Sequence, residues 1–183
     1  GNMRFQKIMI VTLAFGLIAV SALAQEGAAD LENWGKGPAS HLMTKDEVKA
    51  WKKLKTEDEY KQFIALFWAK RDPTPDTPQN EFREEMDRRV AFANDAFTSG
   101  RTIGSMSDRG GVFIVIGPPY TRKTSAEAPS TNIQTPGGPS TPPREEIWVY
   151  EKDKLPAFSE MPVFEIAFVD QNHTQDWKLG HTP

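Results

Sequence analysis

The sequence contains no cysteine among its 183 residues, and this absence excludes several kinds of site. Disulfides and thiolate metal ligands are unavailable, and so is a lipidated cysteine that would anchor a lipoprotein. Histidine is scarce as well, because only His41, His173 and His181 occur, scattered through predicted loops. The sequence also lacks a His-x-x-x-His pair, Gly-x-Ser-x-Gly and Ser-x-x-Lys motifs, and a glycine-rich phosphate loop. We therefore predict no metal and no cofactor.

Long apolar runs are missing too, apart from one short run near the N-terminus. Arg4 and Lys7 precede a thirteen-residue apolar run at residues 8–20, and Ala22-Leu23-Ala24 then offers the small-x-small pattern that signal peptidase cleaves. We expect residues 1–24 to be a Sec-type signal peptide. Thirteen residues at about 1.5 Å each fall short of a hydrocarbon core of ~30 Å, which argues against stable membrane insertion. An uncleaved signal anchor is the alternative.

The chain that would remain after cleavage, residues 25–183, is acidic and long enough for one domain. It has 20 basic and 25 acidic side chains, a net charge of −5. This balance favours solubility and argues against nucleic acid or an anionic membrane surface as the partner. Residues 1–2 precede the expected start, Met3, and are treated as an artefact. The expected location is the periplasm or the medium outside the cell.

The first half of this chain has helical periodicity. Residues 25–43 are small and polar and are expected to be a flexible lead-in to a domain at residues 44–183. Thr44-Lys-Asp-Glu47 and Thr56-Glu-Asp-Glu59 are capping boxes, which predict two helix starts. The second helix is expected to bury a broad apolar face made of Tyr60, Phe63, Ile64, Phe67 and Trp68.

A proline-rich corner follows the second helix. Pro73, Pro75 and Pro78 lack a backbone N–H and disfavour helix in the preceding residue, so we expect a stiff, extended corner. A third helix is predicted to begin near residues 78–80 and to end near Phe97. Its predicted inner face consists of Phe82, Met86, Val90, Ala93 and Phe97.

The second half changes to strand-like patterns. Residues 112–116 are apolar on both faces and are expected to form a buried central strand. Residues 147–150 and 163–169 predict two further strands, and residues 177–179 a short fourth. Between the first two lies the segment 121–143, which is rich in Pro, Gly, Ser and Thr. We expect a mobile insertion there, because it has too little apolar area to offset its ordering entropy.

The order of these elements predicts the fold class. Helices come first and strands follow, without βαβ alternation, which is typical of an α+β fold. We expect about three N-terminal helices packed on a small antiparallel sheet of three to four strands.

One segment imitates a calcium loop. Asp170, Asn172, Thr174 and Asp176 have the spacing of its first half. The glycine of the sixth position and the acid of the twelfth are both absent, so we favour a turn between strands.

The proline-rich corner resembles a signature of the bacterial GWxTD-domain family. The segments that resemble it most closely are Arg71-Asp72-Pro73-Thr74-Pro75, Asn80-Glu81 and Arg89. Ile147-Trp148-Tyr150 and Phe168-Val169-Asp170 also follow the family pattern. The resemblance covers about residues 43–179 and implies an exported bacterial domain whose activity is unassigned.

The motif that names the family is matched in part. Within Gly104-Ser105-Met106-Ser107-Asp108, Gly104 and Asp108 match the Gly-Trp-x-Thr-Asp pattern, and Ser107 keeps the hydroxyl of the threonine. Ser105 replaces the tryptophan, so the indole of the family motif is absent.

The charged residues of these segments suggest a structural network. We expect the corner, the third helix and the turn before residues 112–116 to meet, joined by pairs between carboxylates and guanidinium groups. The predicted members are Arg71, Asp72, Pro73, Asn80, Glu81, Arg89, Gly104, Ser107, Asp108 and Arg109. The alternative interpretation is an acidic pocket shared by Asp72, Glu81 and Asp108.

Two functions remain open from the sequence. The first is a non-catalytic binding or structural module that recognises a protein or another component of the cell envelope. The alternative is a hydrolase that acts on envelope glycan or peptide through Asp72, Glu81 and Asp108. Two of these carboxyl groups would then have to face a common cleft about 5–9.5 Å apart. Because no catalytic motif is present, we favour the first.

Overall fold

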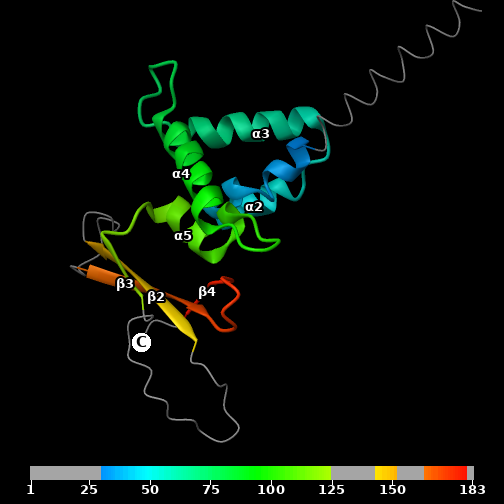
Figure 1. The fold of residues 1–183 in the computed structure, drawn as a ribbon. Helices are drawn as coiled ribbons and strands as arrows, with labels where there is room; N and C mark the ends of the chain where they lie inside the picture. Colours follow the sequence, from blue (N-terminus) through cyan, green and yellow to red (C-terminus); the bar gives the residue numbers. More distant parts are fainter. Residues whose placement is uncertain (1–29, 125–142, 152–162, 181–183) are drawn as a thin grey trace, which may run out of the picture. The chain divides into compact units, whose positions relative to one another are not determined.

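The computed structural model of the protein describes residues 30–124, 143–151 and 163–180 (Figure 1). The chain divides into two compact units, Gly1–Lys70 and Arg71–Pro183, and each is described on its own. The predicted signal peptide and residues 125–142 of the predicted insertion lie outside the described residues. Across the described ranges, no helix has both the length and the apolar character needed to cross a membrane.

The first unit consists of short helices with well-formed starts. It contains the 3-10 helix η1 (Pro38–Leu42) and the helices α2 (Lys45–Trp51) and α3 (Glu57–Ala69). Both predicted capping boxes are confirmed, since Thr44 and Thr56 each accept a hydrogen bond from the backbone N–H of the glutamate three residues on. Each glutamate in turn accepts one from the backbone N–H of its threonine. These bonds satisfy donors that a helix start leaves open.

Trp34 lies at the centre of the aromatic core of this unit. Its ring packs against four others, with centroid distances of 5.1–6.4 Å, namely Trp51, Phe63, Phe67 and Trp68. Gly35 permits this approach, because a Cβ there would lie 2.2 Å from Cε2 of Trp51. The predicted flexible lead-in is therefore wrong for the described residues 30–43, which form helical turns and contribute a core ring.

The second unit begins with the long helix α4 (Glu81–Phe97). Asn80 caps it by accepting a hydrogen bond of 2.9 Å from the backbone N–H of Arg83. The predicted inner face is confirmed, with Met86, Ala93 and Phe97 buried.

The apolar run at residues 112–116 is helical, which corrects the predicted central strand. It belongs to α5 (Asp108–Ile116), preceded by the 3-10 helix η2 (Gly104–Met106). A short apolar run fits either periodicity, so local capping decides. Ser107 Oγ accepts a hydrogen bond of 3.1 Å from the backbone N–H of Gly110, which starts a helix. Burial is accordingly one-sided, because Phe113 is 8% exposed and Val115 is 50% exposed.

The sheet is an antiparallel meander with the order β1-β2-β3-β4. Its strands are β1 (Thr121–Thr124), β2 (Arg144–Glu151), β3 (Val163–Asp170) and β4 (Lys178–Leu179). The last three confirm predicted strands, whereas β1 occupies the start of the predicted mobile insertion. Helices followed by an antiparallel sheet confirm the α+β class.

The register places a polar and aromatic row on one face of the sheet. Arg144 pairs with Asp170 and Trp148 with Ile166, so alternate residues of β2 point the same way. This face contributes to the core of the second unit, which consists of Ala93, Phe97, Phe113, Trp148, Tyr150 and Phe168.

Candidate functional site

The proline corner holds itself together by hydrogen bonds at its exposed surface. Asp72 accepts a bond of 3.0 Å from the backbone N–H of Thr74, and the Thr74 hydroxyl donates to Glu81. That hydroxyl, followed by the backbone N–H of Glu81 itself, lowers the pKa of the Glu81 carboxyl. Arg71 is half-buried at the start of the corner and Pro73 is exposed. The Glu81 carboxyl is therefore stabilised in its charged form.

The segment Gly104-Ser105-Met106-Ser107-Asp108 packs on the C-terminal half of α4. A Cβ at Gly104 would lie 1.8 Å from the carbonyl oxygen of Ala93, and one at Gly110 would lie 1.9 Å from the carbonyl oxygen of Gly104. Only glycine permits both contacts. Ser105 is 1% exposed, and its backbone N–H donates to Asn94 Oδ1 at 2.9 Å. A tryptophan in its place would have to displace this packing.

Asp108 links helix α5 to the sheet. It is the first residue of α5, and its carboxylate accepts a hydrogen bond of 2.7 Å from the backbone N–H of Leu179 in β4. Ser107, besides capping α5, donates to the carbonyl oxygen of Gly104 at 2.7 Å. Both polar residues of the motif therefore hold backbone in place.

Arg89 performs a similar task at the other end of α5. Its Nη1 donates to the carbonyl oxygen of Ile114 at 3.0 Å, which satisfies one of the open acceptors of the helix end. Its Nε pairs with Glu85 at 2.8 Å and lowers the pKa of that carboxyl.

The predicted meeting of corner and motif is wrong. The corner residues Asp72 and Glu81 lie at the start of α4, whereas Gly104 packs against Ala93 near its end. A helix of 17 residues is about 25 Å long, so Asp108 and the corner acids share no pocket. The ten predicted members instead fall into three local groups. These are Arg71, Asp72, Pro73, Asn80 and Glu81 in the corner, Arg89 between α4 and α5, and Gly104, Ser107, Asp108 and Arg109 at the start of α5.

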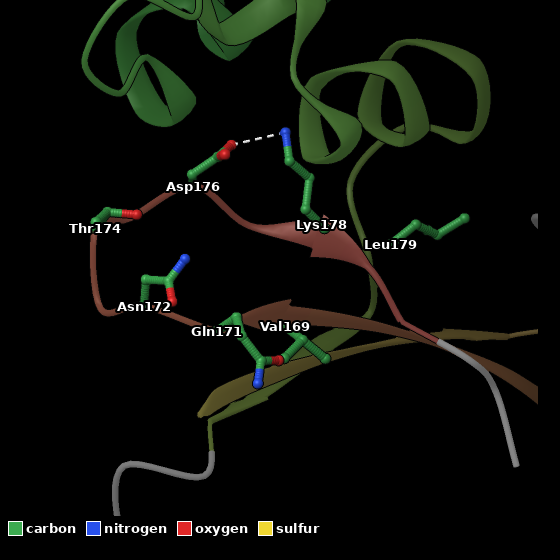
Figure 2. A pocket seen from close by; sticks show the side chains of 7 residues that line it. All are labelled: Val169, Gln171, Asn172, Thr174, Asp176, Lys178 and Leu179. Atoms are coloured by element: carbon green, nitrogen blue, oxygen red, sulfur yellow. Dashed lines mark ion pairs between the residues drawn. The ribbon is translucent and has the colours of Figure 1, made fainter. Parts of the chain in front are cut away.

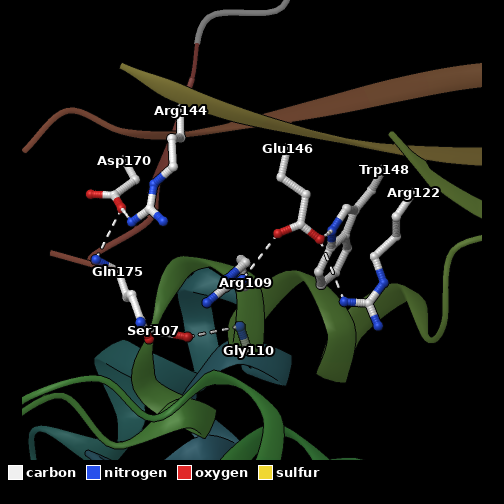
Figure 3. A network of polar contacts seen from close by, with 9 residues as sticks. All are labelled: Ser107, Arg109, Gly110, Arg122, Arg144, Glu146, Trp148, Asp170 and Gln175. Atoms are coloured by element: carbon white, nitrogen blue, oxygen red, sulfur yellow. Dashed lines mark hydrogen bonds and ion pairs between the residues drawn. The ribbon is translucent and has the colours of Figure 1, made fainter. Parts of the chain in front are cut away.

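A different network joins α5 to the sheet (Figure 3). Glu146 of β2 is only 5% exposed, and its carboxylate accepts three hydrogen bonds. The donors are Arg109 Nη1 at 3.0 Å, Trp148 Nε1 at 2.8 Å and Arg122 Nη1 at 3.4 Å. A buried carboxylate is stable only when its oxygens are satisfied in this way.

A second buried carboxylate, Asp170, extends this network (Figure 3). Arg144 pairs with it, and the backbone N–H groups of Thr174 and Gln175 each donate to it at 3.0 Å. Burial alone would raise the pKa of Asp170, but Arg144 and the two N–H groups lower it overall. These bonds hold the segment as a turn between β3 and β4, as predicted. The described ranges hold no group of three potential metal-binding side chains.

Aromatic rings pack against the guanidinium groups of the network. The guanidinium of Arg109 lies 5.0 Å from the ring centroids of both Phe97 and Trp177, and that of Arg144 lies 5.6 Å from Trp177. Burial lowers the pKa of Arg109, an effect that Glu146 opposes. Trp177 thus connects the two ion pairs through its ring.

The sequence pattern singled out Asp170 only as part of the family pattern and of the loop after residues 163–169, and Glu146 not at all, although one signal for Glu146 was present. The alternation that places Trp148 and Tyr150 on the core face also places Glu146 and Arg144 there. Extending the predicted strand towards its N-terminus would have revealed a carboxylate on the buried side.

Comparison with known families matches the model of the GWxTD domain to residues 36–130, just over half of the chain. The chain belongs to the GWxTD-domain family. No curated protein and no solved structure matches it. Membership of the GWxTD family assigns no activity. The matched region of this GWxTD domain includes the corner, α5 and β1 but ends before β2. It therefore contains Arg109 and Arg122 and omits their shared partner, Glu146.

Proposed function

We propose that this chain is a non-catalytic binding module of the bacterial cell envelope. The observation that carries the proposal is that the fold uses each carboxylate considered for catalysis. Asp72 accepts from a backbone N–H of the corner, Glu81 from the hydroxyl of Thr74, and Asp108 from the backbone N–H of Leu179. The export pattern of residues 4–24 supports a location in the periplasm or outside the cell.

The carboxylate-dependent hydrolase is not supported. A general acid that works near neutral pH needs a raised pKa, which burial in an apolar site provides. The Glu81 carboxyl shows the opposite, because the Thr74 hydroxyl lowers its pKa at an exposed position. Asp108 lies beside the other end of α4 and cannot act together with it.

The proline corner supports a recognition role. The backbone N–H of Thr77 donates to the carbonyl oxygen of Thr74 at 3.0 Å, which places Pro75 and Asp76 at the centre of a β-turn. The Thr77 hydroxyl also donates to the carbonyl oxygens of Thr74 and Gln79. An exposed segment fixed in this way loses little conformational freedom when a partner binds, so binding is less costly.

Affinity capture from envelope extract tests the proposal. Purified residues 25–183 are immobilised as wild type, as the double variant Thr74→Val/Thr77→Val, and as Thr121→Val, a matched change on exposed β1. We expect wild type and Thr121→Val to retain the same envelope component and the double variant to retain at least about tenfold less. Recovery of no component would contradict the binding module, and equal recovery by all three would contradict the corner as its surface.

A deletion of residues 125–142 is a second arm of the same capture experiment. It removes most of the Pro/Ser/Thr-rich segment but leaves β1 and β2 intact.

Fractionation of expressing cells tests the location. We expect an exported chain whose N-terminus is Gln25, and retention of the intact N-terminus in the cytoplasm would contradict export.

A further inference from the structure

A concavity of about 420 Å³ lies where β3 passes into β4 (Figure 2). We call it the β3–β4 pocket. Its polar wall includes the side chains of Gln171, Asn172 and Thr174 from the loop, and Asp176 and Lys178 beside them. The volume is within the range of about 300–1,000 Å³ that is usual for small-molecule sites.

Hydrogen bonds to Asp170 and Ser99 hold the backbone of the loop that lines the pocket. The buried Asp170 accepts hydrogen bonds from the backbone N–H groups of Thr174 and Gln175, and Ser99 Oγ donates to the carbonyl oxygen of Thr174 at 3.2 Å. Arg144 in turn pairs with Asp170. The backbone of the loop is thus fixed before any ligand arrives.

Two residues of this loop have a backbone conformation that side chains disfavour. His173 has φ 55° and Gln175 has φ 65°, in the left-handed region. In this region Cβ lies close to the following carbonyl oxygen, so the conformation costs free energy relative to ordinary backbone. Such conformations persist where surrounding bonds enforce them, and they are concentrated at binding and catalytic sites. Here they flank Thr174.

The chemistry of the wall selects the class of ligand. The amides of Gln171 and Asn172 and the hydroxyl of Thr174 can both donate and accept hydrogen bonds, as ligand hydroxyls do. Lys178 pairs with Asp176 at 2.9 Å, so these two charges cancel. The wall therefore suits a ligand with several hydroxyl groups and no net charge.

Two apolar residues, Val169 and Leu179, also line the pocket, and Leu179 is 57% exposed. Because Val169 pairs with Lys178 and Leu179 with Phe168, their side chains point to opposite faces of the sheet, so Leu179 alone offers an apolar contact to one face of a ligand. A sugar ring presents hydroxyls at its edge and C–H groups on its face. It can therefore bond to the amides and the hydroxyl while its face covers Leu179.

We infer that the β3–β4 pocket binds a neutral saccharide, through Asn172, Thr174 and Gln171 on its hydroxyls and through Leu179 on its apolar face. The inference deepens the proposed function and rests on it, because it names a glycan as one envelope component that the module binds. It assigns that binding to a surface other than the proline corner.

Titration followed by nuclear magnetic resonance tests the inference on ¹⁵N-labelled residues 25–183. The probes are a β-1,4-linked N-acetylglucosamine tetramer, a maltotetraose and, as an anionic control, a tetragalacturonate. We expect at least one neutral tetramer to cause saturable shifts at residues 169–179 with a dissociation constant below about 10 mM. Asn172→Ala/Thr174→Val should weaken this binding at least about tenfold, whereas Asn33→Ala and Thr121→Val should not.

Leu179→Ser provides a second variant if the double variant loses its fold, because it removes the apolar side chain of the pocket and leaves the Asp170 contacts in place. It should also weaken binding. The inference is overturned if neither neutral tetramer gives saturable shifts up to about 20 mM, if binding survives both variants, or if the anionic tetramer binds most tightly. These outcomes are independent of envelope capture by the corner, so a failure of either proposal is recognised separately.

Discussion

The cores of the two units of this chain are stabilised by different interactions. The first packs rings around Trp34 and has no arginine between residues 30 and 70, where all the side chains that are cationic at neutral pH are lysines. The second combines rings with buried ion pairs that use Arg109 and Arg144. The difference follows from side-chain chemistry. A guanidinium is planar and weakly hydrated, so it can bond to a carboxylate and lie against a ring at once, whereas an ammonium prefers water.

The comparison teaches which perturbations each unit should resist. A core of aromatic rings loses stability when a substitution opens a cavity. Its stability does not depend on the protonation of buried groups. An ion-pair core loses most when one partner is removed, because the other charge stays buried without compensation.

Removal of Glu146 should have the largest effect and tests the ion-pair side of the comparison. Glu146→Leu leaves the buried Arg109 without its carboxylate, so we expect a loss of about 3–5 kcal/mol in the free energy of unfolding. The double variant Glu146→Leu/Arg109→Met removes both charges and should recover most of that loss. Urea denaturation measures both variants and the single variant Arg109→Met. A loss in the double variant equal to the sum of the losses in the two single variants would contradict the comparison.

Removal of the central ring tests the aromatic side. Trp34→Ala should cost about 3 kcal/mol, because it opens a cavity among four rings. Hydrogen exchange should show faster opening of α2 and α3 with unchanged protection of β2. Equal loss of protection in β2 would show that the two units do not open separately.

Acid titration tests how much the buried carboxylate of Asp170 stabilises the second unit. The pKa of Asp170 is lowered in the folded chain, so its ionised form stabilises the fold above its ordinary value of 3.8. That contribution is lost as the pH falls below 3.8 through the folded value. Asp170→Asn should cost about 1–3 kcal/mol at pH 7 and give a flatter decline of melting temperature below pH 4. An unchanged decline would mean that Asp170 contributes nothing to acid sensitivity.

Removal of the capping hydroxyls of α3 and α5 should give the smallest effects, and the two substitutions can be compared with each other. Thr56→Ala removes the capping hydroxyl of α3 and should cost about 1 kcal/mol. Ser107→Ala should cost up to about 2 kcal/mol, because its hydroxyl also donates to Gly104. Thermal unfolding of both variants measures the difference, and a larger loss for Thr56→Ala would reverse the expected order.

Local features of the fold could be predicted from the sequence. The capping boxes at Thr44 and Thr56 depend on partners three residues away, and the strands β2 and β3 follow from alternation. The helix α5 was missed because a short apolar run fits both periods, and Ser107 was assigned to the family motif and the predicted network instead of to a helix start.

Partners distant in the sequence could not be predicted. Asp108 bonds to a backbone N–H 71 residues away, and Glu146 pairs with an arginine 37 residues away. The register of the sheet sets these distances, whereas charge alone suggests many possible pairs. Asp72 shows the opposite case, since its carboxylate bonds only two residues along the chain.

The ion pair between Arg109 and Glu146 has a practical consequence for the choice of truncation boundaries. The family match stops at residue 130, so a fragment cut at its borders would keep two guanidinium groups and discard the counter-ion they share. It would also lose the amide that engages Asp108. Cloning boundaries and chimeric proteins should therefore extend through Leu179, because the matched stretch is not a self-sufficient folding piece.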